Sequence, residues 1–145
     1  MKYNFGIVKE LKNGETRVAI SPDVVAMLRE NGLNVLIETN AGVLSGFTND
    51  DYIQNGATIA NSAEEVWNNS KIIVKVKEPQ KEEFKFFRED LTIISYLHLA
   101  VDEVLTKELL KKKVTTIACE SVEAKDGKLP LLRPMSEVAG RLAVQ

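Results

Sequence analysis

Residues 71–96, KIIVKVKEPQKEEFKFFREDLTIISY, contain two apolar runs with a polar segment between them. The runs KIIVKV (71–76) and LTIISY (91–96) are rich in β-branched residues and predict two strands. The second run is almost wholly apolar, which is typical of a strand that is covered on both faces. The segment 82–87 predicts a short helix, so the whole stretch indicates a strand, a helix and a parallel strand.

The same alternation continues on both sides of this unit. Further strands are expected at 3–9, 34–38, 57–59 and 114–118. Helices are expected after Ser21-Pro22, Thr48 and Ser62, around Val101 to Leu109, and from Pro134 onward. Helical spacing places Val24, Met27 and Leu28 on one face of the first helix, and Val101, Val104, Leu105 and Leu109 on one face of a later helix. Strands that alternate with helices in this way predict an α/β fold with a doubly wound, mostly parallel sheet.

Composition excludes several classes of protein. The chain has 145 residues, which is enough for a single domain. Its 19 Lys plus Arg and 21 Asp plus Glu are mixed along the sequence, which leaves no basic face for nucleic acid. No apolar run approaches the ~20 residues of a membrane span, and MKYNFGIVKE has no signal-peptide layout. A single cysteine, Cys119, excludes an internal disulfide and fits a cytoplasmic protein, and we expect it to be buried. One cysteine and one histidine leave little for a metal site, and none is expected.

Three cationic or ionisable residues follow predicted strands. Arg17 lies in the loop after the first strand, Lys77 follows KIIVKV, and His98 follows LTIISY. Loops at the carboxyl ends of parallel strands line the ligand crevice of an open sheet, so the three should open toward one edge. A guanidinium, an ammonium and an imidazole suit a small anionic substrate, since Arg grips carboxylates and His exchanges protons near neutral pH.

Each of these residues also has a structural interpretation. Arg17 follows Glu15 closely and fits a solvated loop residue equally well. Lys75 and Lys77 fit the exposed tip of an edge strand, which is the commoner position of lysine. His98 lies between Leu97 and Leu99, which fits a hydrogen-bonded histidine in the core.

Phosphate-binding glycine motifs are absent. The sequence contains neither G-x-G-x-x-G nor G-x-x-x-x-G-K-[ST], so the usual cradle for a dinucleotide is missing. The last segment carries Met135, Val138, Ala139 and Leu142 on one helical face, and this apolar stripe is expected to be exposed in the isolated chain.

Several motifs together resemble the N-terminal part of the alanine dehydrogenase family, which also contains the transhydrogenase alpha subunit. They are GIVKELKNGETRVAISP (6–22), AGVLSGFTND (41–50), KVKEP (75–79), YLHLA (96–100) and LPLLRPMSEVAGRLAVQ (129–145). The resemblance implies a Rossmann-like substrate domain over residues 1–133. It also implies that residues 134–145 begin a helix that links to an NAD-binding domain beyond this chain. Family members are more than twice as long, which implies a truncated domain, either a piece of a longer protein or a split-gene product.

The resemblance also implies roles for five residues. Arg17 would bind the substrate carboxylate, and Lys77 would bind a carboxylate or carbonyl oxygen and take part in catalysis. His98 would be the acid/base catalyst. Met135 would lie near the substrate, and Ser136 near the nicotinamide.

The implied reaction is the oxidation of L-alanine with NAD to pyruvate and ammonium, in a homo-oligomer. Two alternatives stay open. The first is the N-terminal domain of a transhydrogenase alpha subunit, although such subunits generally lack the histidine of YLHLA. The second is a non-catalytic domain that binds a small molecule or a partner.

Overall fold

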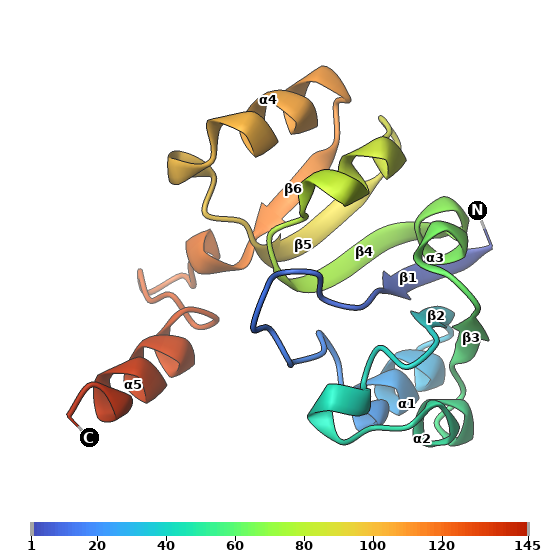
Figure 1. The fold of residues 1–145 in the computed structure, drawn as a ribbon. Helices are drawn as coiled ribbons and strands as arrows, with labels where there is room; N and C mark the ends of the chain where they lie inside the picture. Colours follow the sequence, from blue (N-terminus) through green and yellow to red (C-terminus); the bar gives the residue numbers. More distant parts are fainter. Residues whose placement is uncertain (1, 145) are drawn as a thin grey trace.

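The computed structural model describes residues 2–144, and these form one parallel sheet (Figure 1). Its strands are β1 (Tyr3–Ile7), β2 (Val35–Glu38), β3 (Thr58–Ala60), β4 (Ser70–Lys77), β5 (Thr92–Tyr96) and β6 (Thr115–Ala118). The order is β3-β2-β1-β4-β5-β6, and every neighbouring pair is parallel. This is the Rossmann-like α/β arrangement that the alternation of strands and helices predicted.

Most of the helices begin directly after a Ser, Thr or Asp residue, the types that favour the N-cap position. They are α1 (Pro22–Glu30), α2 (Asn49–Gln54), α3 (Ala63–Asn69), α4 (Glu103–Lys111) and α5 (Arg133–Leu142), with 3-10 turns η1 (Val43–Ser45), η2 (Lys81–Phe86), η3 (Leu99–Val101) and η4 (Cys119–Ser121). The hydroxyl of Ser62 accepts a hydrogen bond from the backbone of Glu65 at 3.2 Å, as the Ser-x-x-Glu spacing predicted. The Glu65 carboxylate turns back to the amide of Asn61, one residue before the cap.

Two apolar clusters cover opposite faces of the sheet. On one face α1 and α2 contribute Val25 and Tyr52 to a cluster that contains Ile7 and Ile37. On the other face α3, η2 and α4 surround a second cluster, whose largest buried side chain is Trp67. Helices on both faces explain why the central strands carry apolar residues on both sides of the sheet. Cys119 is buried, as expected.

Coverage of the sheet is incomplete at the β5–β6 end. Ile93 of β5 is fully buried, but Ile94 on the opposite face is only half-buried. Its neighbour in β6, Ile117, is 43% exposed. Within residues 2–144, the expectation that both faces of residues 91–96 are covered is therefore correct for one face only.

The helical faces also differ in part from the predicted stripes. Helix α1 buries Val25, whereas Met27 is 62% exposed. Helix α4 begins only at Glu103, so Val101 falls in η3 and is 86% exposed, while Leu105 and Leu109 are buried as predicted. Apolar spacing alone did not show which of two adjacent valines faces the sheet.

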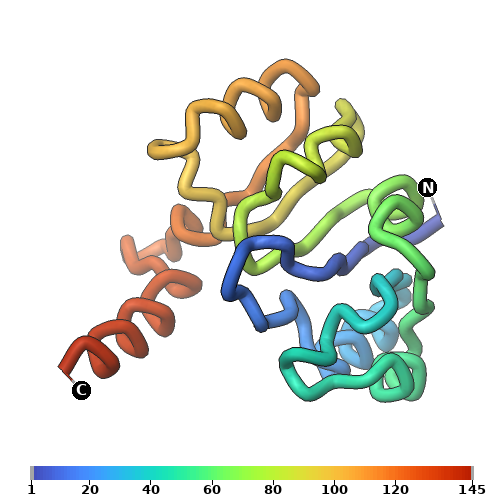
Figure 2. Tube along the Cα trace, viewed as in Figure 1, coloured from blue at the N-terminus to red at the C-terminus, as the bar shows by residue number. Residues whose placement is uncertain are grey.

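Helix α5 projects away from the sheet (Figure 2). It begins at Arg133, one residue before the expected start, and its apolar residues Val138 and Leu142 are exposed. The segment before it is attached to β5, because the Tyr96 hydroxyl donates to the carbonyl of Leu131 at 2.7 Å. No helix among the described residues has the length and apolar character needed to cross a membrane.

Candidate functional site

The chain reverses its direction of travel across the sheet between β1 and β4. These neighbouring strands are central, and the chain leaves β1 toward β2 but leaves β4 toward β5. The loop after β1 and the segment after β4 therefore diverge at one edge of the sheet. Such a switch point is where open α/β sheets bind ligands. Arg17 lies in the first of these loops, and Lys77 is the last residue of β4.

Arg17 is exposed, and its guanidinium is paired along one edge with Glu15. The Glu15 carboxylate accepts from Arg17 Nε at 2.8 Å, from Nη2 at 2.7 Å and from the Arg17 backbone amide at 2.9 Å. The hydrogen bonds from Arg17 lower the pKa of Glu15 to about 2, and the carboxylate in turn raises the pKa of Arg17. Arg17 is therefore an exposed loop residue, as the structural interpretation expected, and Glu15 holds its guanidinium in one orientation.

Lys77 is half-buried and acts on the same carboxylate. Its positive charge adds to that of Arg17 in lowering the pKa of Glu15. For Glu78, burial raises the pKa, but the hydrogen bond from Lys12 and the charges of Lys12 and Lys77 leave it lowered. The edge-strand interpretation of Lys77 is wrong because β4 lies between β1 and β5.

Lys75, two residues earlier on β4, has a different environment. Its side chain is fully buried, and Nζ lies 3.3 Å from Glu10 and 3.1 Å from Glu83. Burial raises the pKa of Glu83, while the charge of Lys75 opposes that rise. Lys75 is thus part of the interior, and the expectation that it forms an exposed strand tip is wrong.

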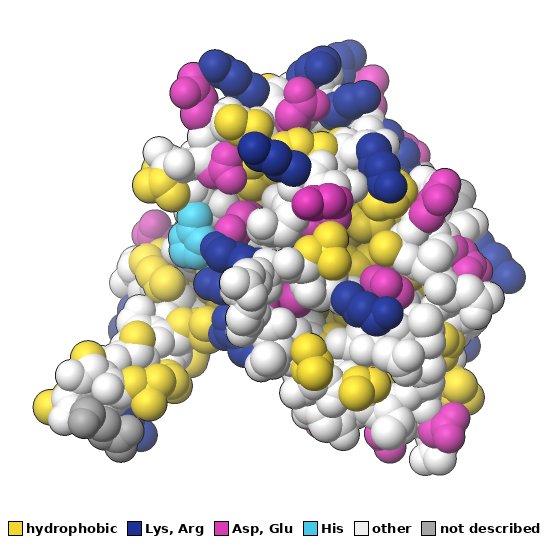
Figure 3. Space-filling view, viewed as in Figure 1, with side chains coloured by type: hydrophobic (Ala, Val, Ile, Leu, Met, Phe, Trp, Pro, Cys, Tyr) yellow, Lys and Arg dark blue, Asp and Glu magenta, His cyan; other side chains and the backbone are white. Residues whose placement is uncertain are grey.

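His98 is the second residue after β5 and is exposed, so it is not a core histidine. Its backbone is in the left-handed region, with φ 49° and ψ 39°. It borders a cavity of about 350 Å³ together with Glu120 and Ser121. It also borders a second cavity, of about 260 Å³, which it shares with Lys12 and Glu78. The second cavity joins His98 to the residue that follows Lys77, and Figure 3 shows the histidine (cyan) beside Lys and Arg side chains.

Helix α5 brings two further predicted residues to this edge. Arg17 Nη1 lies 3.6 Å from the sulfur of Met135, which is half-buried. The next residue, Ser136, is exposed, and its hydroxyl donates to the carbonyl of Leu132 at 3.3 Å. The structure therefore brings Arg17 and Met135 into contact with each other, with Lys77 close enough to influence Glu15. His98 lies one loop further along the same edge.

Sequence reasoning missed four carboxylate or hydroxyl groups at this edge. Glu15 and Tyr96 lie next to the predicted residues in the motifs ETR and YLH, so their position in those motifs was the available signal. Tyr96 holds the segment before α5, and its pKa is raised by burial. Glu10 accepts from backbone amides of β4, and Glu120 accepts from amides of the two residues that follow β5; nothing in their sequence spacing indicated these contacts.

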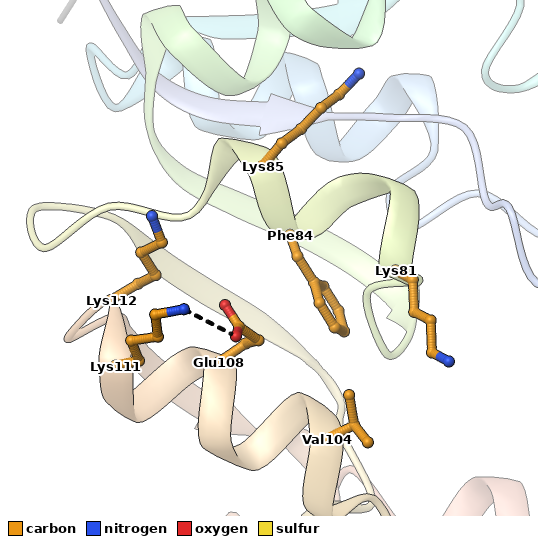
Figure 4. A pocket seen from close by; sticks show the side chains of 7 residues that line it. All are labelled: Lys81, Phe84, Lys85, Val104, Glu108, Lys111 and Lys112. Atoms are coloured by element: carbon orange, nitrogen blue, oxygen red, sulfur yellow. Dashed lines mark hydrogen bonds and ion pairs between the residues drawn. The ribbon is translucent and has the colours of Figure 1, made fainter.

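A basic pocket of about 510 Å³ lies elsewhere, between η2 and α4. Lys81, Lys85, Lys111 and Lys112 line it. Figure 4 shows that their ammonium groups point in different directions, and Lys111 is paired with Glu108 at 3.4 Å. These lysines do not converge on one ligand position. Within residues 2–144, no group of three or more His, Cys, Asp or Glu side chains is arranged to hold a metal ion.

Comparison with known proteins gives matches over most of the chain. The family model for "Alanine dehydrogenase/PNT, N-terminal domain" matches residues 6–139. The chain belongs to this family. The alanine dehydrogenase of Staphylococcus saprophyticus is 51% identical over 140 residues, which are 97% of this chain and 38% of that protein. The chain thus spans well under half the length of the curated relatives it matches.

Two solved structures are also similar to this member of the family. An L-alanine dehydrogenase superposes with a TM-score of 0.93 at 46% identity, over 98% of this chain and 39% of the other. A transhydrogenase from Sinorhizobium meliloti superposes with a TM-score of 0.74 at 28% identity, over 80% of this chain and 34% of the other. The similarity to the alanine dehydrogenase is greater by each of these measures.

Proposed function

We propose that this chain is the substrate-binding N-terminal part of an NAD-dependent alanine dehydrogenase. The enzyme would convert L-alanine, NAD and water to pyruvate, ammonium and NADH. One observation carries the proposal. Arg17 lies in the loop after β1 and Lys77 at the end of β4, the two segments that diverge at the switch point, and Glu15 orients the Arg17 guanidinium by accepting from Nε at 2.8 Å and from Nη2 at 2.7 Å. The guanidinium of Arg17 keeps donors that Glu15 does not occupy, and such donors can bind a substrate carboxylate through two parallel hydrogen bonds.

The pairing with Glu15 defines how Arg17 would bind substrate. Glu15 occupies the edge of the guanidinium formed by Nε and Nη2. The donors left for a substrate carboxylate are on Nη1 and on the second hydrogen of Nη2, which together form the end of the fork. Lys77 would then bind the carbonyl oxygen of pyruvate and draw electron density from its carbon.

His98 would transfer the protons of the reaction. Its exposure leaves the imidazole accessible to a substrate, and imidazole exchanges protons near neutral pH. In alanine oxidation His98 would take a proton from the attacking water or from the carbinolamine, and it would return one in the reverse direction. Met135 would border the substrate beside Arg17.

The residues of this chain do not fit NAD itself. The loop between β1 and α1 has one glycine, Gly14, and it carries Glu10 and Glu15 where a pyrophosphate would need amide donors. Helix α1 starts with Pro22, which has no amide hydrogen, and Ser21 makes no side-chain cap. We therefore assign dinucleotide binding to a segment outside this chain, and we keep only Ser136 as a contact for the nicotinamide.

Cytoplasmic location and self-association are part of the same proposal. The buried free thiol of Cys119 fits a reducing compartment. The exposed apolar residues of α5 fit an interface with another part of the enzyme or with another copy.

A chimeric enzyme tests the activity. In it this chain replaces the matching N-terminal segment of the Staphylococcus saprophyticus alanine dehydrogenase. Reduction of NAD that depends on L-alanine supports the proposal. Hydride transfer only between two nicotinamide nucleotides would favour a transhydrogenase instead, and a folded chimera with neither activity would overturn the proposal. Calorimetric titration of the 145-residue chain with pyruvate tests separately whether this part binds substrate unaided.

A further inference from the structure

The carboxylate of Glu120 contacts two successive backbone amides at the end of β5. Oε1 accepts from the amide of His98 at 2.6 Å, and Oε2 accepts from the amide of Leu97 at 3.2 Å. Glu120 lies in η4, two residues after the end of β6. The last paired residues of these strands are Ser95 and Ala118, so the amides of Leu97 and His98 lie beyond the β5–β6 ladder.

Glu10 makes the same arrangement at the end of β4. Its Oε1 accepts from the amide of Val76 at 2.6 Å, and its Oε2 accepts from the amide of Lys77 at 3.3 Å. Glu10 lies three residues after the end of β1, and the last pair between β1 and β4 is Ile7 with Val74. The buried ammonium of Lys75, 3.3 Å from Oε2, keeps this carboxylate in place.

Both carboxylates continue a ladder that the neighbouring strand no longer provides. A carboxylate has two oxygens on one side, so it can accept from two adjacent amides as a bidentate group. The carboxylate charge makes such bonds stronger than bonds to neutral acceptors. In each case the second amide belongs to a residue that the proposed function assigns to the site.

His98 needs such an arrangement more than Lys77 does. Its left-handed backbone, with φ 49°, is unfavourable for a residue with a Cβ. A strained backbone of this kind persists only where its surroundings hold it. The His98 amide donates a hydrogen bond of 2.6 Å to Glu120, and the His98 carbonyl accepts one of 3.1 Å from the amide of Val101.

We propose that Glu10 and Glu120 are positioning residues that fix the backbone, and hence the side-chain direction, at Lys77 and His98. They contact no substrate. That Glu10 and Glu120 matter for substrate binding rests on the proposed function, but the backbone conformation that they impose does not. An experiment can therefore separate the two.

Nuclear magnetic resonance of the 145-residue chain tests the backbone part without a ligand. On acidification, the amide signals of Leu97 and His98 should move together as Glu120 is protonated, and those of Val76 and Lys77 should move together with Glu10. The Glu120→Gln variant has one acceptor oxygen in place of two. It should abolish the joint movement at 97 and 98 and shift the amide-to-Hα coupling of residue 98 away from the left-handed value.

Exposed neighbours provide matched controls. Glu123→Gln removes the same charge three residues after Glu120. Glu82→Gln removes an exposed charge next to Glu83, which shares the ammonium of Lys75 with Glu10. Both should leave the four amide signals unchanged. If Glu120→Gln does not fold, the acid titration of the wild-type chain still decides. Independent movement of the two amides, or an unchanged coupling at residue 98 in a folded variant, would overturn the proposal.

The chain has one histidine, so its imidazole signal is unambiguous and reports on substrate. With pyruvate, the wild-type His98 ring signal should shift to saturation. Glu120→Gln should raise the pyruvate concentration that half-saturates this shift about tenfold, the size expected for one lost charged hydrogen bond. The rest of the spectrum should stay unchanged. A wild-type ring that ignores pyruvate would count against the proposed function alone, whereas an equal response in wild type and Glu120→Gln would overturn the positioning role.

Discussion

Arg17 Nη1 lies 3.6 Å from the sulfur of Met135, although the two residues are 118 positions apart in the sequence. This contact joins the loop after β1 to helix α5. It places an apolar, polarisable side chain beside the free end of the guanidinium fork. The substrate carboxylate and the small side chain of alanine would be recognised by these two neighbours.

Substitution of Arg17 tests the proposed carboxylate site. Arg17→Lys keeps the positive charge but loses the fork, so pyruvate binding should weaken by at least about tenfold, and Arg17→Ala should abolish it. Calorimetry of the chain measures both. Arg141→Ala, on the exposed part of α5, is the control and should bind normally. Equal affinity in Arg17→Lys and wild type would contradict bidentate binding.

The stability that the Glu15–Arg17 ion pair contributes should be lost in acid. The pKa of Glu15 is lowered from 4.5 to about 2 in the folded chain, mainly by hydrogen bonds from Arg17. Its contribution is therefore complete above pH 4.5 and is lost as the pH falls from 4.5 to 2. The melting temperature of Glu15→Gln should be lower than that of wild type near neutral pH and should approach it in acid. A difference that does not change over this range would argue against the pair, and Glu64→Gln is an exposed control.

The buried Lys75 should be required for stability. Lys75→Met leaves Glu10 and Glu83 inside the protein without their counter-charge, which should cost about 3–5 kcal/mol of unfolding free energy. Lys71→Met, on the exposed start of the same strand, should change it little. The deficit measured by urea unfolding should be smaller at pH 5 than at pH 7. Burial already raises the pKa of Glu83, so its carboxyl takes up a proton readily and is then no longer a buried charge.

His98→Ala in the chimeric enzyme should lower the turnover of L-alanine by about 10²–10⁴-fold, the usual contribution of a general acid or base. The rate of NADH formation at saturating alanine measures this. Binding of pyruvate through Arg17 should persist, because the Arg17–Glu15 pair does not involve the imidazole. Nearly normal alanine oxidation in this variant would remove His98 from the mechanism.

The exposed apolar residues of α5 should promote self-association of the isolated chain. Val138 and Leu142 are exposed on this projecting helix, and large apolar patches are typical of interfaces. Sedimentation velocity at increasing concentration should show oligomers. The double variant Val138→Ser with Leu142→Ser should shift the distribution to monomer. A wild-type chain that stays monomeric at high concentration would contradict this prediction.

Local patterns predicted most of the elements but not the orientation of every helix. The predicted strands 71–76 and 91–96 correspond to β4 (Ser70–Lys77) and β5 (Thr92–Tyr96), and the capping residues Thr48 and Ser62 precede helices. Met27 fits the apolar spacing of α1 and yet is exposed, because Val25, two residues earlier, faces the sheet instead. Spacing fixes which residues share a helical face, while the rotation of the helix depends on the strand residues it meets.

Period and motif are local properties, so the parallel α/β fold, the family and the positions of Arg17, Lys77 and His98 at or after the ends of strands could be predicted from the sequence. What each of these three residues contacts depends on the tertiary structure. Lys75 and Lys77 are two positions apart on β4, but one is sealed against Glu10 and Glu83 while the other reaches the edge of the sheet. Glu10 and Glu120 reach their amides only because β1 and β6 end before β4 and β5 do. Strand length relative to a neighbour arises from pairing across the sheet, and no segment of the sequence encodes it alone.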